Sequence, residues 1–153
     1  MFKYFVIIIT VLFLSACEGN TYFESNLEIP DNTWDAEQAA VFDFEIPDSL
    51  QTFDLYLKIA NTNEYRYSNL WLLVKTFRKE GDVAFDTLEY FLADEKGKWL
   101  GEKNGDEFLN NLPYKAKVRF PKSGKYSVEI IQLMRDLKLK GISRVGFEIK
   151  KVK

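Results

Sequence analysis

The chain has 153 residues, of which 46% are hydrophobic and 16% aromatic, and its 21 basic and 23 acidic side chains give a formal net charge of −2. This length fits one domain with a sizeable core. The lack of a basic block and of net positive charge excludes a typical nucleic-acid partner. With no histidine and one cysteine, the chain lacks the residues for Ser-His-Asp or Cys-His catalysis and for the common transition-metal sites, so no cofactor or metal is expected.

The first 17 residues have the pattern of an export signal. Lys3 is the one charge before an uncharged run at residues 5–14, whose ten residues fall within the ~7–15 of a signal-peptide core and below the ~20 of a membrane span. Cys17 follows Leu14 and two small residues. This pattern resembles the lipobox of bacterial lipoproteins, which implies cleavage after residue 16, attachment of diacylglycerol to the Cys17 thiol and acylation of the new amine, for example by palmitate. Two or more acyl chains hold a protein stably on a bilayer.

Removal of residues 1–16 would leave 137 residues with a formal charge of −3, because Lys3 leaves with the signal peptide. Residues 17–33 are polar and interrupted by Gly19 and Pro30, which predicts a lipidated cysteine followed by an unpacked tether. The folded domain is expected at residues 34–153. Trp34 precedes the first apolar run; we expect it to plug the end of the domain, with a ligand platform as the alternative.

From residue 41 onward apolar and polar side chains alternate, as in strands with one buried face. Residues 70–77 are apolar on both sides, which favours a central strand. Gly81 suits a hairpin because it tolerates positive φ. Strands are predicted at residues 41–46, 53–59, 70–77, 83–92, 118–120, 126–134 and 145–149, with loops at 47–49, 78–82 and 138–141.

Residues 93–113 interrupt this rhythm with a polar stretch that contains Gly97, Gly101 and Gly105. Within it, residues 106–112 are expected to form a short helix. Trp99 lies in the glycine-rich part and could anchor an interface. Because a connection this long usually carries function or a small element of its own, it is the first candidate for a contact surface.

The pattern as a whole predicts an all-β fold: an antiparallel β-sandwich, jelly-roll-like or immunoglobulin-like, of about seven to nine strands. The 13 Phe, 8 Tyr and 3 Trp of the chain indicate an aromatic-rich core in a domain without disulfides.

A second cluster of aromatic residues, Tyr65, Tyr67 and Trp71, stands beside asparagine and arginine side chains. Such residues can stack on sugar rings and bind hydroxyl groups. They can equally cap the core with their polar ends in water. With Trp99 they form the candidate interaction surface. Exposed coplanar rings in a groove would favour a glycan ligand, and an apolar patch without a groove a protein partner.

Catalysis is not expected. Two carboxylates suffice for glycoside hydrolysis, but the sequence does not distinguish such a pair among its 23 acidic residues, and Asp94 and Glu95 read as loop solvation. Ser49 and Thr87 each lie in an Asp-Ser/Thr-apolar triplet, which resembles the O-glycosylation acceptor of Bacteroidetes. Ser49 is the better candidate because it lies on a turn.

Several motifs together resemble the GldH family of gliding-motility lipoproteins of Bacteroidetes, in order along the whole mature chain. They are FDFEIPDSL at residues 42–50, IANTNEYRYSNL at 59–70, DTLEY at 86–90, AD at 93–94 with GKWLG at 97–101, RFP at 119–121 with GKY at 124–126, and VGF at 145–147.

This resemblance implies a monomeric lipoprotein of the cell envelope, held in the outer membrane through acylated Cys17. It also implies protein partners in the gliding apparatus and in the linked type IX secretion machinery. The family supplies no catalytic residues to carry over. The alternative function is a surface lipoprotein that binds glycans through Tyr65, Tyr67, Trp71 and Trp99.

Overall fold

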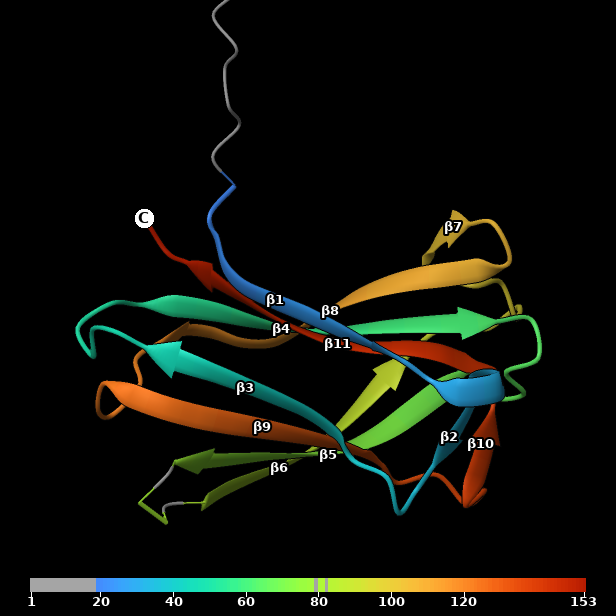
Figure 1. Ribbon diagram of the computed structural model, residues 1–153. Coiled ribbons are helices and arrows are strands. Elements are labelled where there is room, and N and C mark those ends of the chain that lie inside the picture. The colour runs from blue at the N-terminus through green and yellow to red at the C-terminus, as the bar shows by residue number, and fades with distance from the viewer. Residues whose placement is uncertain (1–18, 79, 82) are drawn as a thin grey trace, which may run out of the picture.

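The computed structural model describes residues 19–78, 80–81 and 83–153, so the predicted signal peptide and Cys17 lie outside the described residues. The described chain is an antiparallel β-sandwich (Figure 1), which confirms the predicted fold class. No helix in this part is long and apolar enough to cross a membrane. The elements are β1 (Thr21–Glu28), a 3₁₀ turn η1 (Pro30–Asn32), β2 (Thr33–Asp35), β3 (Ala40–Ile46), β4 (Phe53–Thr62), β5 (Asn69–Arg78), β6 (Val83–Phe91), β7 (Glu102–Asn104), β8 (Glu107–Val118), β9 (Gly124–Gln132), β10 (Lys138–Lys140) and β11 (Ile142–Lys151).

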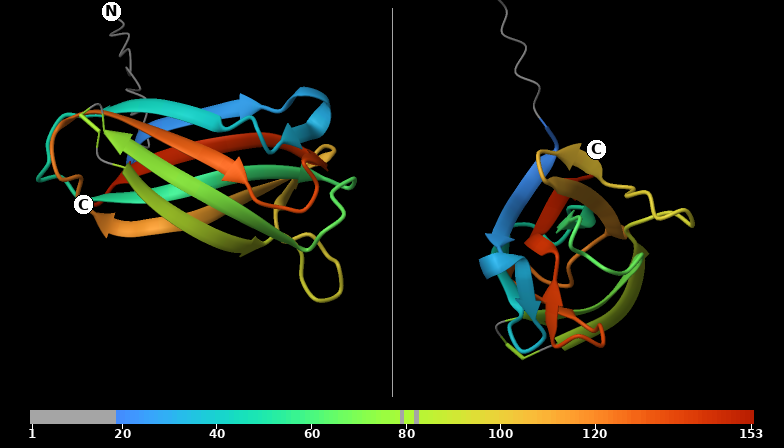
Figure 2. Two further views of the ribbon diagram at one scale, coloured as in Figure 1. Left: turned by 90° about the horizontal axis from the view of Figure 1, so that it is seen from below. Right: turned by 90° about the vertical axis from the view of Figure 1, so that its right-hand side faces the viewer.

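Two sheets form the layers of the sandwich (Figures 1 and 2). The five-stranded sheet has the order β1-β11-β4-β8-β7, and the four-stranded sheet has the order β3-β9-β5-β6. Strands β2 and β10 make a separate two-stranded sheet at one end. The alternation of buried and exposed residues along β3 and β9 shows why the sequence period is two: every second side chain enters the layer between the sheets.

The core between the sheets is rich in aromatic rings, as the composition predicts. The ring of Phe44 stacks on that of Tyr126 with centroids 5.9 Å apart, and Phe120 meets the same tyrosine edge to face at 4.9 Å. Phe147 from the opposite sheet lies 5.6 Å from Phe44. Such offset and edge contacts add to the burial of the rings, so this cluster joins the two layers.

The expected tether at residues 17–33 is largely strand, which corrects the domain boundary. Thr21–Glu28 pairs with β11 along its length. The Phe23 ring lies 5.6 Å from Phe44 of the opposite sheet, and the Tyr22 hydroxyl donates to the Glu45 carbonyl at 2.6 Å. An edge strand needs few buried side chains, so its sequence lacks the apolar alternation that identifies inner strands.

The expected helix at residues 106–112 is wrong, because Asp106 lies in a turn and residues 107–112 belong to β8. The apolar side chains there are spaced as on a helix face, but in the strand the inward row contains Phe108, Asn110 and Leu112. Asn110 is 7% exposed, and its amide donates to Ile59 O at 3.0 Å and to Asn61 Oδ1 at 2.9 Å. The buried polar Asn110 interrupts the alternation of apolar and polar side chains, so the sequence pattern does not show the period of two that is typical of a strand.

Eleven strands occur in the described residues, more than expected. The additional ones are the edge strand β1 and the short strands β2, β7 and β10, of which β10 replaces a predicted loop at residues 138–141. Val118, expected to begin a strand with Phe120, instead ends β8, while Phe120 lies buried in the next connection.

The sandwich has two ends that differ in what they carry. The terminal end holds residues 19–20, the connections 47–52 and 119–123, and the C-terminal residues 152–153. Two backbone hydrogen bonds join the last strand and the C-terminus to the first two of these segments: Lys151 N–H donates to Asn20 O at 2.8 Å, and Val152 N–H donates to Thr52 O at 3.0 Å. The aromatic end holds β2, β10 and the connections 63–68 and 92–101, and it faces the viewer in the right panel of Figure 2.

Candidate interaction surface

The two connections that carry the predicted aromatic residues come together at the aromatic end. The backbone N–H groups of Leu92 and Ala93 donate to Ser68 O, at 2.7 and 3.2 Å. Ala93 also pairs with Trp99 in an isolated bridge, and the Asp94 carboxylate accepts the N–H groups of Lys96 and Lys98. The first part of the 93–113 connection is therefore a small ordered hairpin.

Trp99 is half-buried and fixed on both sides. Its indole N–H donates to Asn63 Oδ1 at 3.0 Å, and its ring lies 5.9 Å from Phe108 and 6.3 Å from Tyr65. The indole of Trp99 therefore already has its polar partner within the chain, and its ring covers the end of the core.

Tyr65 and Tyr67 lie beside Trp99. Tyr65 is 3% exposed and donates its hydroxyl to Asn69 O at 2.6 Å, and its burial raises the pKa of the phenol. The Tyr67 hydroxyl donates to Asp136 Oδ2 at 3.0 Å, and this bond raises the pKa of Tyr67. The two rings meet edge to face at 69°, so they form no flat platform for a sugar.

Gly141 explains how this end closes so tightly. It has φ +89°, and a Cβ there would lie 2.2 Å from the backbone nitrogen of Tyr65. Its carbonyl accepts Thr62 N–H at 2.9 Å, while its own N–H donates to Asn32 O at 2.8 Å. A glycine is needed both for the conformation and for the close approach of the two backbones.

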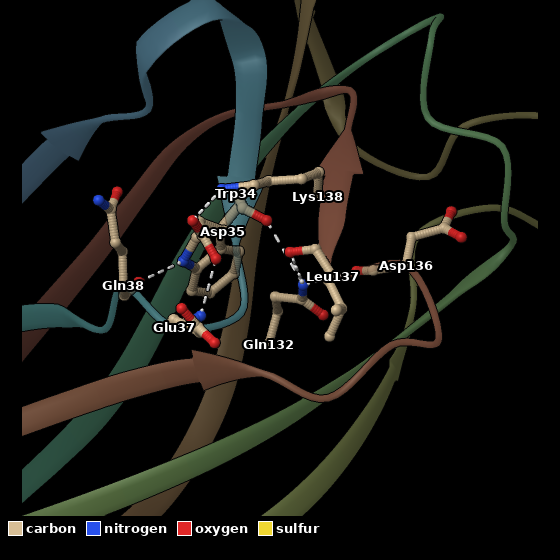
Figure 3. Close-up of polar contacts among 8 residues, drawn as sticks. All are labelled: Trp34, Asp35, Glu37, Gln38, Gln132, Asp136, Leu137 and Lys138. Atoms are coloured by element: carbon tan, nitrogen blue, oxygen red, sulfur yellow. Dashed lines mark hydrogen bonds and ion pairs between the residues drawn. The ribbon is translucent and has the colours of Figure 1, made fainter.

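The predicted plug, Trp34, is confirmed as buried, with 1% exposure. Figure 3 shows its indole N–H donating to Gln38 O at 3.0 Å, and the Gln132 amide reaching Asp136 O at 2.9 Å, with Trp34 O and Leu137 O each at 3.4 Å. The buried glutamine thus joins β2 to the chain before β10. It was not singled out from the sequence, because one polar residue in an apolar strand gives no distinctive signal.

Asp35 and Lys138 close the same sheet from outside with an ion pair (Figure 3). The hydrogen bond from Lys138 lowers the pKa of Asp35, as does the bond from Glu37 N–H to Asp35 Oδ1 at 2.9 Å. This ion pair stabilises the two-stranded sheet at its surface, and its geometry does not indicate an acid and base that act on a substrate.

Trp71, the fourth predicted aromatic residue, lies elsewhere. It is 39% exposed on β5, between the buried Leu70 and Leu72, and so points out from the four-stranded sheet. Other exposed apolar side chains share this outer surface, and Lys75 lies over the ring of Phe85 at 6.0 Å. We call this surface the apolar sheet face; its members are Val41, Trp71, Val83, Phe85, Phe91 and Leu133.

Phe85 and Phe91, exposed by 63% and 59%, are the members that sequence reasoning missed. Along β6 the outward row holds Val83, Phe85 and Phe91 beside Thr87 and Glu89, while the inward row holds Leu88 and Tyr90 together with the polar Asp86. Because both rows of this edge strand mix apolar and polar residues, the sequence does not specify which row faces inward.

A cleft of about 280 Å³ opens where β6 and β8 diverge, and its lining includes Leu55, Tyr114, Val118 and Phe120. At its rim Asp86 accepts the Tyr114 hydroxyl at 2.5 Å and pairs with Lys115 at 2.9 Å. Burial favours the neutral carboxyl, but these two partners hold the pKa of Asp86 below its usual value.

A second hollow of about 280 Å³ lies on the outer face of the five-stranded sheet. Glu148, only 3% exposed, pairs with Lys58 at 3.1 Å, and Lys58 pairs with Glu24 at 2.6 Å. The hydrogen bond from Lys58 lowers the pKa of Glu24. Because these opposite charges pair with one another, this surface offers no uncompensated cluster of charge to a ligand.

Nothing in these sites assembles a metal centre: the described residues hold no group of three or more Cys, Asp or Glu suited to an ion. The two glycosylation candidates lie on accessible backbone. Ser49 is half-exposed in the connection between β3 and β4, and Thr87 is exposed on β6. Their modification stays a prediction.

These features define a class: an all-β sandwich with one end closed by aromatic residues and an apolar face on one sheet. The match to a family model then identifies the chain more closely. Residues 21–149 match the GldH lipoprotein model, and the chain belongs to that family.

Two relatives agree with this assignment. The chain is 37% identical to a gliding motility lipoprotein GldH homolog from Christiangramia forsetii, over 98% of this chain and 96% of the relative. It is 29% identical to the gliding motility lipoprotein GldH of Flavobacterium johnsoniae, over 94% and 93%. Among solved structures, the infectious bursal disease virus VP2 subviral particle aligns with a TM-score of 0.30 and 10% identity, over 86% of this chain and 34% of that chain.

Proposed function

We propose that the protein is a lipid-anchored, non-catalytic accessory component of the gliding motility and type IX secretion machinery, and that it acts by contact with other proteins. The observation that carries this proposal is the match, over nearly the whole chain, to lipoproteins named for gliding motility. Support for contact rather than catalysis comes from three of the four predicted aromatic residues, Tyr65, Tyr67 and Trp99, whose polar atoms are bonded within the fold and so are not free to act on a substrate.

The proposed anchor is Cys17, acylated on the sulfur and on the mature amine, in the outer membrane. Structural support comes from Asn20, which the bond from Lys151 N fixes to the sandwich three residues after Cys17. Mass spectrometry of the mature N-terminus tests the anchor: we expect a chain that begins at acylated Cys17. An unmodified thiol would contradict it.

The proposed protein contact is the apolar sheet face. Exposed large apolar side chains gathered on one surface favour an interaction site, and this sheet face carries Trp71, Phe85 and Phe91, with the polar Lys75 and Glu89 among them. The rings at the aromatic end are tilted against one another and half-buried or buried, which does not favour the alternative of glycan binding there.

Crosslinking of the lipidated protein in its own membranes, followed by pulldown, tests the partner. We expect motility or secretion components, with their yield reduced by the double variant Phe85→Asp/Phe91→Asp. The control is Leu100→Asp, which changes an equally exposed side chain (58%) outside this face. Recovery of glycan alone, or equal loss in the control, would contradict the proposal.

A further inference from the structure

The terminal end carries unpaired positive charge next to the point where the described chain begins. Lys117, Lys122, Lys125 and Lys151 are exposed there, as is Arg119. Within the described residues, none of these five forms an ion pair. The described acidic residues nearby are Glu45, Asp48, Asp54 and Glu80; Asp54 accepts Lys117 N–H at 2.8 Å, and Glu80 lies 3.8 Å from Arg78.

We call these five basic residues the basic patch. They are not consecutive in the sequence, so no run of basic residues indicates the patch. Lys117 and Arg119 come from the end of β8, Lys122 and Lys125 from the next connection and the start of β9, and Lys151 from the end of β11. The register brings them together, since Phe53 pairs with both Val118 and Lys151.

One large apolar side chain projects from the same end. Leu50 is 73% exposed, the highest value among the large hydrophobic residues that are exposed. Its position is fixed: the Leu50 N–H donates to Asp48 Oδ1 at 2.8 Å, and Gln51 Nε2 reaches Val152 O at 3.3 Å. An exposed leucine at the same end as these basic residues matches the chemistry of an anionic bilayer surface, where the apolar group enters the acyl boundary and the cations meet the headgroups.

The short distance to the anchor decides which end can meet the bilayer. Asn20 is three residues after Cys17 in the chain, and three residue steps span at most about 11 Å when fully extended. A strand of twelve residues such as β8 is about 40 Å long, so the aromatic end lies too far away to reach the same bilayer while the terminal end stays at the anchor. The outer face of the five-stranded sheet is the other surface near the anchor, but its basic residues Lys58, Arg144 and Lys150 are already paired with carboxylates.

We propose that the terminal end docks on anionic lipid headgroups, with Leu50 inserted at the interface and the long axis of the sandwich directed away from the membrane. This orientation rests on the proposed acylation of Cys17. It holds the aromatic end and much of the apolar sheet face out in the aqueous space, where protein partners can reach them.

Site-directed labelling of the acylated mature protein tests the orientation. Leu50→Cys and Leu137→Cys place a bimane fluorophore on two equally exposed leucines (73% and 67%) at opposite ends. Acylated Cys17 does not react, so each label is unique. In vesicles of equal parts phosphatidylethanolamine and phosphatidylglycerol with a lipid-borne quencher, we expect quenching at residue 50 to exceed that at residue 137 severalfold. Equal quenching, or stronger quenching at residue 137, would overturn the orientation.

The charge contribution is tested with matched triple variants of the labelled protein. We expect Lys117→Glu/Lys122→Glu/Lys125→Glu to lower quenching at residue 50 at least twofold, and Lys96→Glu/Lys98→Glu/Lys103→Glu, with exposed lysines toward the aromatic end, to leave it unchanged. High salt should act like the first triple. The same response to both triples would overturn the role of the basic patch.

The experiments distinguish a chain that lacks acylation at Cys17 from an acylated chain that lies on the membrane in another orientation. A chain with an unmodified Cys17 would take up label at that thiol, and high salt would release it from vesicles in every variant, which would overturn the lipid anchor and with it the orientation. A chain that floats but shows no difference between residues 50 and 137 would overturn the orientation alone.

Discussion

The two ends of the sandwich use their side chains in opposite ways. At the aromatic end, Trp34, Tyr65, Tyr67 and Trp99 have the chemistry of ligand-binding residues, yet the polar atom of each is bonded within the fold. At the terminal end, Leu50 and a set of lysines have no distinctive chemistry, yet Leu50 is 73% exposed and the lysines form no ion pair within the described residues. Judged by residue type alone, the aromatic end would be the binding surface. Judged by which side chains remain free to make contacts, the terminal end is the better candidate.

This difference shows what a typical binding residue has to satisfy. A tryptophan or tyrosine contributes to recognition when its ring face or its polar atom remains free. Trp71 meets that condition, whereas the other three predicted aromatic residues serve to close the domain. We therefore expect changes at the aromatic end to alter stability, and changes at the terminal end to alter contact with the membrane.

The largest expected effect on stability is that of Trp34→Ala. Truncation leaves a cavity at the closed end and removes the bond to Gln38 O, and large aromatic deletions in cores cost about 3–5 kcal/mol of unfolding free energy. Urea unfolding followed by circular dichroism measures it. The control Trp71→Ala, at a site 39% exposed, should cost about 1 kcal/mol or less. Equal losses in the two variants would mean that Trp34 does not close the core.

A smaller loss is expected for Gln132→Leu. The variant leaves the carbonyls of Asp136 and Leu137 without the amide that they accept, and an unsatisfied buried group costs about 1–3 kcal/mol. Chemical denaturation of this variant beside Gln38→Leu, an exposed glutamine on the same end, separates the buried network from a general response to leucine. A neutral Gln132→Leu would show that the network adds nothing to the packing around it.

Alkaline pH should weaken the fold through Tyr90, whose hydroxyl joins β6 to β8. Burial raises the pKa of Tyr90 to about 12, and its hydroxyl donates to Pro113 O at 2.8 Å. The unfolded chain loses this proton near pH 10, before the folded chain does, so stability falls as pH rises from about 10 to 12. We expect Tyr90→Phe to reduce the slope of unfolding free energy against pH in this range. An unchanged slope would assign the alkaline loss to other groups.

The sequence predicted the inner strands well because burial on one face imposes a period of two, as along Ala40–Ile46. The prediction from sequence failed where burial on one face does not produce this alternation of side chains. The edge strand Thr21–Glu28 buries little, and its backbone bonds to β11 leave no pattern in the side chains. In β8 the buried Asn110 interrupts the apolar row, so the residues around it read as a helix.

The candidate sites divide in the same way. The lipobox-like pattern at Cys17 is local in sequence and can be read directly, and its lipidation remains a proposal. Trp34 and Trp99 are identifiable by type, but their hydrogen-bond partners depend on the fold. The basic patch is assembled from three strand ends, and Phe85 reaches the surface because it lies in the outward row of β6, although both rows of that strand contain apolar residues. Such surfaces depend on register and on sheet order, which a single sequence does not state.

The smallest expected effect on stability, and the sharpest contrast between the two ends, is that of Leu50→Ser. A side chain 73% exposed contributes little to the core, so unfolding free energy should change by no more than about 0.5 kcal/mol. Vesicle affinity, measured with a Cys17→Ser mature chain that depends on its surface alone, should fall because the apolar contact with the bilayer is lost. Leu137→Ser removes a leucine of similar exposure from the opposite end and should change neither quantity. If both serine variants reduced vesicle binding alike, the ends would be equivalent toward membranes; a loss confined to Leu50→Ser would establish that they are not.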